Sequence, residues 1–367
     1  MLVVVTCVII AIILSYLDSK GIIDYGMKLS FIITGFLLAI HYDYGNDYMP
    51  YYHMYLDIWQ NDYSISYVIN DLIIRNNEYG WTLISLFFSN FGENGFYLMV
   101  AVLTSFQTWV YYYTITKYVP RNWWWFATFI YLTDTSLYIL EFSMMRQSLA
   151  IAVFLLLFEW ILKRKILKTL IVIYFLTTIH SSAIVLFPTA FFGYLPIKGG
   201  KVYAWIVIIL FAACFISKTF LTSIFQYMSS IEQVERYYDS YLGSEQLNKF
   251  GLGFIVLLIP FALCMGYLFI KKDISQKALI SILIACLSYI IIPFGQIVQL
   301  ISRIGFYFTA YSVIALPIAY GSIQDQLIKY GLVVIECSIL MYIFITFFNN
   351  PIWIEHYSNF DTIFSVL

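Results

Sequence analysis

Long apolar runs, separated by short polar segments, recur along the whole sequence. Twelve such runs are present. Each is predicted to form a membrane-crossing helix, because about 20 apolar residues cover the hydrocarbon core of a bilayer. The runs cover residues 2–17, 28–42, 96–116, 122–140, 141–162, 166–181, 182–196, 202–218, 250–270, 277–294, 300–321 and 329–349. Because 166–181 and 182–196 are short enough to form one re-entrant hairpin, the pattern predicts an all-α polytopic membrane protein with 10 to 12 spans.

The composition agrees with a membrane-embedded chain. Hydrophobic residues make up 62% of the sequence and charged residues 11%, whereas soluble domains carry about 25% charged residues. We therefore expect residues 1–367 to form a single integral membrane domain. The net charge of −1 gives no reason to expect a nucleic-acid partner. The five cysteines all lie in apolar runs, so no disulfide framework or metal site is indicated.

The distribution of positive charge predicts the sidedness of the chain. If the turn at 18–28 is cytoplasmic, fourteen of the twenty lysines and arginines fall on the cytoplasmic side and four fall outside. The segments predicted to be extracytoplasmic are then 43–95, 219–249 and the tail 350–367. The cytoplasmic turns are short and carry no nucleotide-binding motif, so we expect chemistry on the outer side, without ATP or a nucleotide sugar.

Several polar residues occur at one predicted depth, near the outer headgroups. A charge within a transmembrane helix costs about 2.5–3.5 kcal/mol, so such residues indicate function by default. The residues in question are Asp47, Glu78, Asp134, Glu141, Arg146, Gln147, His180 and Arg303. Structural alternatives exist for them. The arginines can reach lipid headgroups or pair with Glu141 or Asp134, His180 can cap a helix break, and Asp47 can be a turn residue.

These residue types together fit glycosyl transfer from a lipid diphosphate. Arginine binds phosphate through paired, charge-assisted hydrogen bonds, and it stabilises the negative charge of a departing diphosphate. Tyrosine and tryptophan faces stack on sugar rings, and a carboxylate or imidazole can take a proton from an attacking hydroxyl. Because the arginines neutralise the charge, this chemistry requires neither a metal nor another cofactor.

Five short motifs resemble the EpsG family of bacterial polysaccharide polymerases, which are relatives of Wzy-type O-antigen and capsule polymerases. The motifs are "HYDYGNDYMPYYHMY" (41–55), "EYGW" (78–81), "MRQSLA" (145–150), "HSSAIV" (180–185) and "SRIGFYF" (302–308). The resemblance implies a glycosyltransferase C-like fold in the bacterial cytoplasmic membrane. It also implies exopolysaccharide synthesis by joining repeat units carried on undecaprenyl diphosphate at the outer leaflet. The sequence departs from the family pattern at His41, where an arginine is expected.

We predict the following roles on this basis. The catalytic candidates are Asp47, Glu78 and His180, with Asp47 favoured as the base that activates the acceptor. A helix beginning near Pro50 would place Tyr52, Tyr55 and Trp59 on one face above the glycan. The predicted substrate-binding residues are His41, Tyr48, Tyr52, Tyr55, Arg146, Gln147 and Arg303. The expected partner is the undecaprenyl-diphosphate-linked oligosaccharide, as donor and acceptor; a chain-length regulator and a flippase of the same pathway are further candidate partners.

Three other functions remain open at the level of sequence. A flippase for the same lipid-linked oligosaccharide needs a polar path across the whole bilayer, whereas the inner halves of these helices are apolar. A membrane acyltransferase with a cytoplasmic donor would place its histidine on the opposite side from His180. A ligase that transfers finished glycan to another acceptor is closely related to a polymerase, and the sequence does not separate the two.

Overall fold

Helices make up most of the chain. The computed structural model describes residues 1–61, 63–66, 68, 70, 78–228, 252–295 and 299–365. Within these residues the only strands are β1 (His41–Tyr42) and β2 (Asp361–Thr362). The prediction of a helical fold is confirmed, with these two short strands as the exception. A helix is the expected form for such apolar segments, because it satisfies every backbone N–H and C=O internally.

The chain forms two compact units. Unit 1 comprises Met1–Phe191 and Cys337–Leu367, and unit 2 comprises Phe192–Glu336. The elements within unit 1 are β1, β2, α1 (Leu2–Ser19), α2 (Gly26–Ile40), α3 (Tyr48–Gln60), α5 (Tyr79–Ser89), α6 (Gly95–Tyr118), η1 (Arg121–Trp123), α7 (Trp124–Thr133), α8 (Tyr138–Glu141), α9 (Met145–Leu162), α10 (Ile166–Ile179), α18 (Ile354–Tyr357) and η4 (Ile363–Ser365). The elements within unit 2 are α11 (Gly200–Met228), α13 (Leu252–Ile270), α14 (Gln276–Gly295), α15 (Gln299–Thr309) and α16 (Ser312–Gly321). The 3₁₀ helix η2 (Ser181–Tyr194) and helix α17 (Gln326–Phe348) continue from one unit into the other.

The predicted count of about twelve spans is not confirmed. Among the described residues, four helices are long and apolar enough to cross a membrane: Leu2–Ser19, Met145–Leu162, Gly200–Ser217 and Gln326–Phe348. A fifth is obtained if Arg303–Thr309 and Ser312–Gly321, which meet at a 51° bend, form one broken span. Several other predicted spans are apolar but short. Helix α2, for example, has 15 residues, which corresponds to about 22 Å at 1.5 Å per residue.

The break before α9 changes one predicted span. The run 141–162 was expected to be one helix, but Glu141 ends α8 and α9 begins at Met145. The residues between them turn the chain, and Ser143 N–H and Met144 N–H both donate to the carbonyl of Leu140. Glu141 is therefore not on the helix that carries Arg146. Its carboxylate is buried and accepts a hydrogen bond from Tyr131 Oη.

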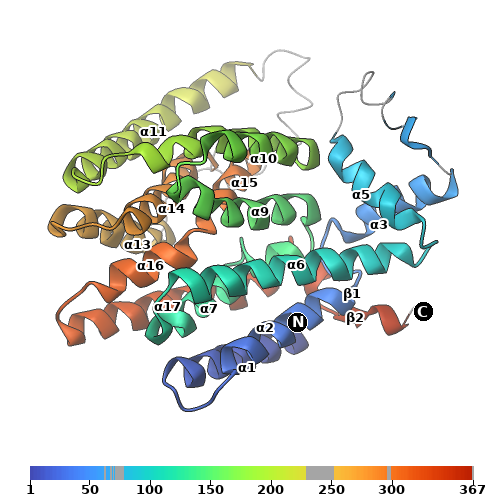
Figure 1. Ribbon diagram of the computed structural model, residues 1–367, viewed down its shortest axis with the longest axis horizontal. Coiled ribbons are helices and arrows are strands. Elements are labelled where there is room, and N and C mark those ends of the chain that lie inside the picture. Colours follow the sequence, from blue (N-terminus) through green and yellow to red (C-terminus); the bar gives the residue numbers. More distant parts are fainter. Residues whose placement is uncertain are drawn as a thin grey trace. The chain divides into compact units, whose positions relative to one another are not determined.

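The segment predicted as the first extracytoplasmic loop contains α3 and α5. These helices lie beyond one end of α6 (Figure 1). They bury an aromatic cluster against α6, so the tyrosines of this segment largely face inward. The buried members of this cluster are Tyr48, Tyr51, Tyr55, Trp81, Phe88, Phe96, Tyr97, Met99, Val100 and Met145. Residues 229–249 of the second predicted loop lie outside the described residues.

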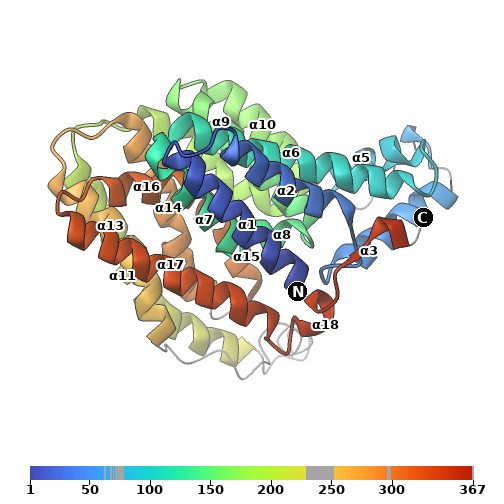
Figure 2. The ribbon, with the colours of Figure 1, turned by 90° about the horizontal axis from the view of Figure 1, so that it is seen from below.

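The tail returns to the segment that follows α2. Strand β2 pairs antiparallel with β1, so that His41 lies opposite Thr362 and Tyr42 opposite Asp361. Both views place this end of the chain beside β1 and near α3 (Figures 1 and 2). Segments far apart in the sequence thus meet where α2 ends.

Candidate active site

Glycine at position 80 allows α5 to approach α10 very closely. A Cβ atom at this position would lie 2.3 Å from Oγ1 of Thr178 and 3.0 Å from the Thr178 backbone. Any larger residue would therefore push the two helices apart. Since α5 begins at Tyr79 and α10 ends at Ile179, this contact places Glu78 beside the residues that follow α10.

The carboxylate of Glu78 accepts hydrogen bonds from three donors. Arg146 Nη1 lies 2.5 Å from Oε2. The backbone N–H of Ser181 lies 2.6 Å from Oε1, and Nδ1 of His180 lies 3.1 Å from the same oxygen. Ser181 is the first residue of η2, and a helix N-terminus favours a negative charge. Three helix termini thus converge on one carboxylate.

These contacts keep Glu78 ionised. Burial raises the pKa of its carboxyl, but the hydrogen bonds from His180 and Ser181 and the charge of Arg146 outweigh burial and lower the pKa to about 2. A carboxylate with this pKa is a poor proton acceptor near pH 7. We interpret Glu78 as the residue that orients Arg146 and His180, rather than as the base.

The guanidinium of Arg146 is held at two of its three nitrogens. Its Nε donates to Tyr51 Oη at 3.1 Å, and Cζ lies 5.1 Å from the centre of the Tyr51 ring. The Tyr51 ring in turn packs against Trp81, with centroids 5.3 Å apart. In the described part of the chain, Nη2 makes no hydrogen bond. The side chain is 28% exposed, and Nη2 is the nitrogen left for an anion.

His180 is also fixed on one side. Because the Glu78 oxygen is an acceptor, Nδ1 of His180 carries the proton in this hydrogen bond. The side chain is 20% exposed, and Nε2 has no hydrogen bond to the residues that the structure describes. A neutral imidazole in this arrangement presents a lone pair at Nε2.

Asp47 lies directly before α3. Its backbone N–H donates to Ser143 Oγ at 3.1 Å, and its Oδ1 accepts from Asn46 Nδ2 at 2.9 Å. The Asp47 carboxylate is partly exposed, and its charge interacts with Arg146 and with Tyr51. Unit 1 therefore brings all three catalytic candidates around Arg146.

The tyrosines of α3 differ in their surroundings. Tyr48 and Tyr55 are buried, and their hydroxyls donate to the backbone, at His41 O and at Phe88 O with Gly92 O. We interpret both as core residues. Tyr52 stays partly exposed, with its ring stacked on Tyr97 and its hydroxyl donating to Glu93 Oε1 at 3.1 Å.

His41 lies at the end of α2 and is completely buried. Its Nδ1 is 2.6 Å from Leu38 O, and its Nε2 is 3.3 Å from Phe142 O. Both ring nitrogens thus face backbone carbonyls. This position ties α2 to the turn before α9, and we assign it no contact with substrate.

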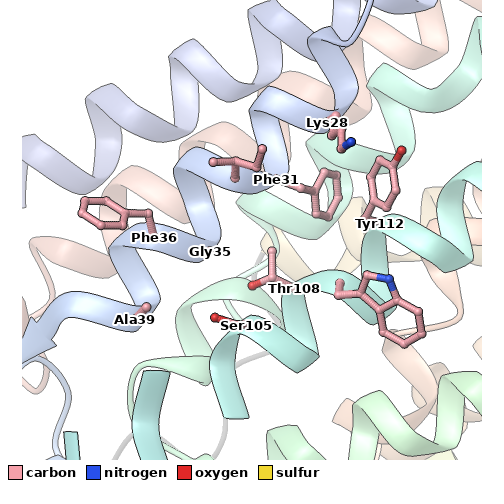
Figure 3. Close-up of a pocket in the computed structure, with 10 residues that line it drawn as sticks. Lys28, Phe31, Gly35, Phe36, Ala39, Ser105, Thr108 and Tyr112 are labelled. Atoms are coloured by element: carbon pink, nitrogen blue, oxygen red, sulfur yellow. The ribbon is translucent and has the colours of Figure 1, made fainter. Parts of the chain in front are cut away.

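A groove of about 410 Å³ runs between α2 and α6 (Figure 3). Its walls are mostly aliphatic and aromatic, and Lys28 is the one charged residue among them. No carboxylate or imidazole lines this groove. We therefore place the reacting groups at Glu78, Arg146 and His180 and not here.

The sequence profile of the EpsG family matches residues 25–359, which is nearly the whole chain. The chain belongs to the EpsG family. No curated protein and no solved structure matches it. Family membership indicates a membrane protein that acts as a glycosyltransferase-like polysaccharide polymerase.

Two predicted ligands of this EpsG-family protein are not among the contacts just described. Gln147 follows Arg146 on α9, but its side chain is buried. Arg303 belongs to unit 2, where it lies in the first turns of α15 and is partly exposed. Its predicted convergence with Arg146 stays a prediction, as does the glycosyltransferase C-like fold.

Some contributors to the EpsG-family site were not predicted from the sequence. Tyr51 and Trp81 support Arg146, and the backbone of Ser181 holds Glu78. Trp81 belongs to the "EYGW" motif, which was the available signal for it. No three His, Cys, Asp or Glu side chains gather into a metal-binding group among the described residues.

Proposed function

We propose that this protein joins oligosaccharide repeat units carried on undecaprenyl diphosphate, at the outer face of the bacterial cytoplasmic membrane. The family supplies the general activity, that of a polysaccharide polymerase. The observation that carries the rest is the half-occupied guanidinium of Arg146. Tyr51 binds its Nε and Glu78 binds its Nη1, and the third nitrogen, Nη2, is left for a phosphate oxygen.

The proposed reaction is a glycosyl transfer between two lipid-linked chains. A hydroxyl of the acceptor glycan attacks the anomeric carbon of the donor, and a new C–O bond forms. The bond between that carbon and the diphosphate oxygen breaks, and undecaprenyl diphosphate leaves. Arg146 stabilises the negative charge that develops on the leaving diphosphate, because its position is already fixed before the reaction begins.

A base must take the proton of the acceptor hydroxyl. We assign this role to Asp47, which is partly exposed and interacts with the charge of Arg146. His180 is the alternative, because Glu78 fixes its ring and leaves Nε2 open. Glu78 itself orients both Arg146 and His180. Tyr52 remains a candidate for stacking on a sugar ring.

The first experiment replaces Arg146 by lysine in the purified enzyme and measures transfer from lipid-linked repeat units. Lysine keeps the charge, but its single nitrogen cannot reproduce the planar spread of the guanidinium donors toward Glu78, Tyr51 and a phosphate. We therefore expect turnover to fall by about 10²-fold or more. Arg164→Lys, at an arginine of the predicted cytoplasmic turn, is the control and should retain activity. Wild-type turnover in Arg146→Lys would contradict the proposal.

A deletion strain distinguishes the proposed activity from its relatives. Loss of a polymerase leaves single repeat units on the lipid carrier at the outer face. Loss of a ligase would leave full-length chains on the carrier, and loss of a flippase would trap repeat units inside. The lipid-linked glycan profile of such a strain therefore tests polymerisation separately from the role of Arg146.

A further inference from the structure

The loop that carries Asp47 is bound by the tail of the chain. This loop, residues 43–47, connects β1 with α3. On the tail side, β2 pairs with β1, and the carbonyl of His356 accepts a hydrogen bond from Gly45 N–H at 3.1 Å. Figure 2 shows the tail alongside α3. Backbone contacts thus hold the loop at its start and in its middle.

An aromatic contact reinforces the backbone pairing. The ring of Tyr44 packs edge-on against Tyr357, with centroids 5.0 Å apart, and against Phe360 at 5.1 Å. On its other side Tyr44 meets Phe142 at 5.1 Å. Tyr44 and Tyr357 are both buried, although each lies outside a long helix. Tyr44 of the loop therefore packs between the tail and the turn before α9.

A polar chain then leads from the tail to Asp47. Burial raises the pKa of Tyr357 and the neighbouring Ser143 hydroxyl lowers it. Ser143 Oγ donates to Asn46 Oδ1 at 2.8 Å. The same oxygen accepts from Asp47 N–H at 3.1 Å, while Asn46 Nδ2 donates to the Asp47 carboxylate at 2.9 Å. Ser143 precedes Arg146 by three residues. One hydroxyl thus links the tail, the Asp47 loop and the start of α9.

The loop can reach this position only because residue 45 is glycine. Gly45 has φ +118°, which residues with a side chain rarely adopt, and a Cβ atom would lie 2.9 Å from Phe142 O and from Ser143 Cβ. A pair of two-residue strands is only marginally stable in isolation. The position of the loop therefore depends on what binds it from the other side.

We propose that the tail, residues 356–362, is a positioning element of the active site: Tyr357 and the β1–β2 pair hold the Asp47 loop in its working place. This inference rests on the proposed function, in which Asp47 accepts the proton. The tail makes no contact with the reacting atoms in this scheme. Its effect passes through Asp47, because Glu78, Arg146 and His180 are held by α5, α9 and α10 instead.

The test compares Tyr357→Ala, Tyr357→Phe and Glu355→Gln in the full-length protein. Glu355 is exposed on the same short helix and serves as the control. A displacement of about 1 Å in a reacting group costs roughly 10²-fold in rate. We expect Tyr357→Ala to lower kcat by about tenfold or more, with the KM for the lipid donor nearly unchanged. Tyr357→Phe keeps the ring and should recover most of the turnover, and Glu355→Gln should match wild type.

Coupling with Asp47 separates positioning from general damage. In an Asp47→Asn background, Tyr357→Ala should cause little further loss, because both changes remove the same function. If the double variant lost turnover by the product of the two single-variant losses, the inference would be overturned. A Tyr357→Ala protein whose kcat equals that of the wild type would also overturn it.

Hydrogen exchange tests the positioning itself, independently of any activity. In Tyr357→Ala, exchange should become faster in residues 41–48 and stay unchanged in 78–82 and 145–150. Unchanged protection of 41–48 would overturn the inference even if turnover fell. If the wild-type protein showed no glycosyl transfer, the proposed function would fail, and faster exchange in 41–48 would still establish that the tail holds this loop.

Discussion

Glu78 and Arg146 form an ion pair in which Oε2 of the carboxylate lies 2.5 Å from Nη1 of the guanidinium. The two residues come from the starts of different helices, α5 and α9. Their side chains are 18% and 28% exposed, so the pair is neither fully buried nor open. It fixes the position of the Arg146 guanidinium, whose Nη2 makes no hydrogen bond to the described residues.

The first prediction concerns the pH dependence of stability. The Glu78 pKa of about 2 lies below the ordinary value of 4.5. Ionised Glu78 therefore stabilises the folded state above about pH 4.5, and this contribution is lost as the pH falls from about 4.5 to about 2. Glu78→Gln should lower the thermal unfolding temperature at pH 7, and its difference from wild type should shrink towards about pH 3. Glu355→Gln, at an exposed carboxylate, is the control; a difference for Glu78→Gln that stays constant over this range would contradict the assignment.

The second prediction concerns the close contact between α5 and α10. Gly80→Ala places a Cβ atom 2.3 Å from Thr178 Oγ1, so the helices must separate. We expect a destabilisation of about 1–3 kcal/mol and a loss of turnover, because Glu78 moves with α5. Gly266→Ala is the matched control, since nothing lies within 4 Å of a Cβ at that helical position. Chemical denaturation measures the stability and a transfer assay measures the turnover. Wild-type stability and turnover in Gly80→Ala would contradict the predicted close contact between α5 and α10.

The third prediction concerns the support of Arg146 by Tyr51. Tyr51→Phe keeps the ring beneath the guanidinium but removes the hydroxyl that accepts from Nε. We expect donor affinity to weaken by about tenfold, which corresponds to ~1.4 kcal/mol. The hydroxyl of Tyr55 binds only backbone carbonyls, so Tyr55→Phe should affect stability and not affinity. Equal donor affinities in Tyr51→Phe and wild type, measured with purified lipid donor, would remove Tyr51 from the site.

The fourth prediction separates the two candidate bases. Asp47→Asn should lower turnover by roughly 10²–10⁴-fold while donor binding is kept. Loss of His180 as a base would have the same effect on turnover, so His180→Gln is measured in parallel. If Asp47→Asn retains near-normal turnover and His180→Gln does not, the histidine oriented by Glu78 is the base.

The fifth prediction concerns sidedness. In a cysteine-free background, a membrane-impermeant thiol reagent added from outside should label Glu355→Cys in the predicted outer tail. It should not label Lys198→Cys in the predicted cytoplasmic turn. Labelling of Lys198→Cys in intact cells would invalidate the predicted topology, and with it the outer location of the site.

Sequence reasoning selected Glu78, Arg146 and His180 as candidates because they carry chemical signals. A glutamate, an arginine and a histidine at one predicted depth in apolar surroundings are costly, and this cost marks them for shared function. The structure places Glu78, Arg146 and His180 in direct contact. The close approach of Gly80 to Thr178 was not predicted from the sequence.

Other features left no such signal. The 3–4 spacing of Tyr52, Tyr55 and Trp59 predicts a shared face, but spacing does not say whether that face meets a sugar or the core. For Tyr55 it meets Phe96, at a centroid distance of 5.6 Å. Hydropathy likewise cannot separate a full span from a short apolar helix such as α2. The pairing of His41 with Thr362 joins two-residue strands, which are too short to show a periodic pattern.

The contact between Gly45 and His356 has a consequence for how the enzyme matures. The Asp47 loop is synthesised early, directly after the second predicted span, whereas His356 and Tyr357 follow the last one. The loop can take its place only after the ribosome has added these late residues and they have reached the same side of the membrane. A nascent or truncated polymerase would therefore insert its helices without becoming competent to extend a glycan. Competence would therefore follow the synthesis and placement of residues 356–362.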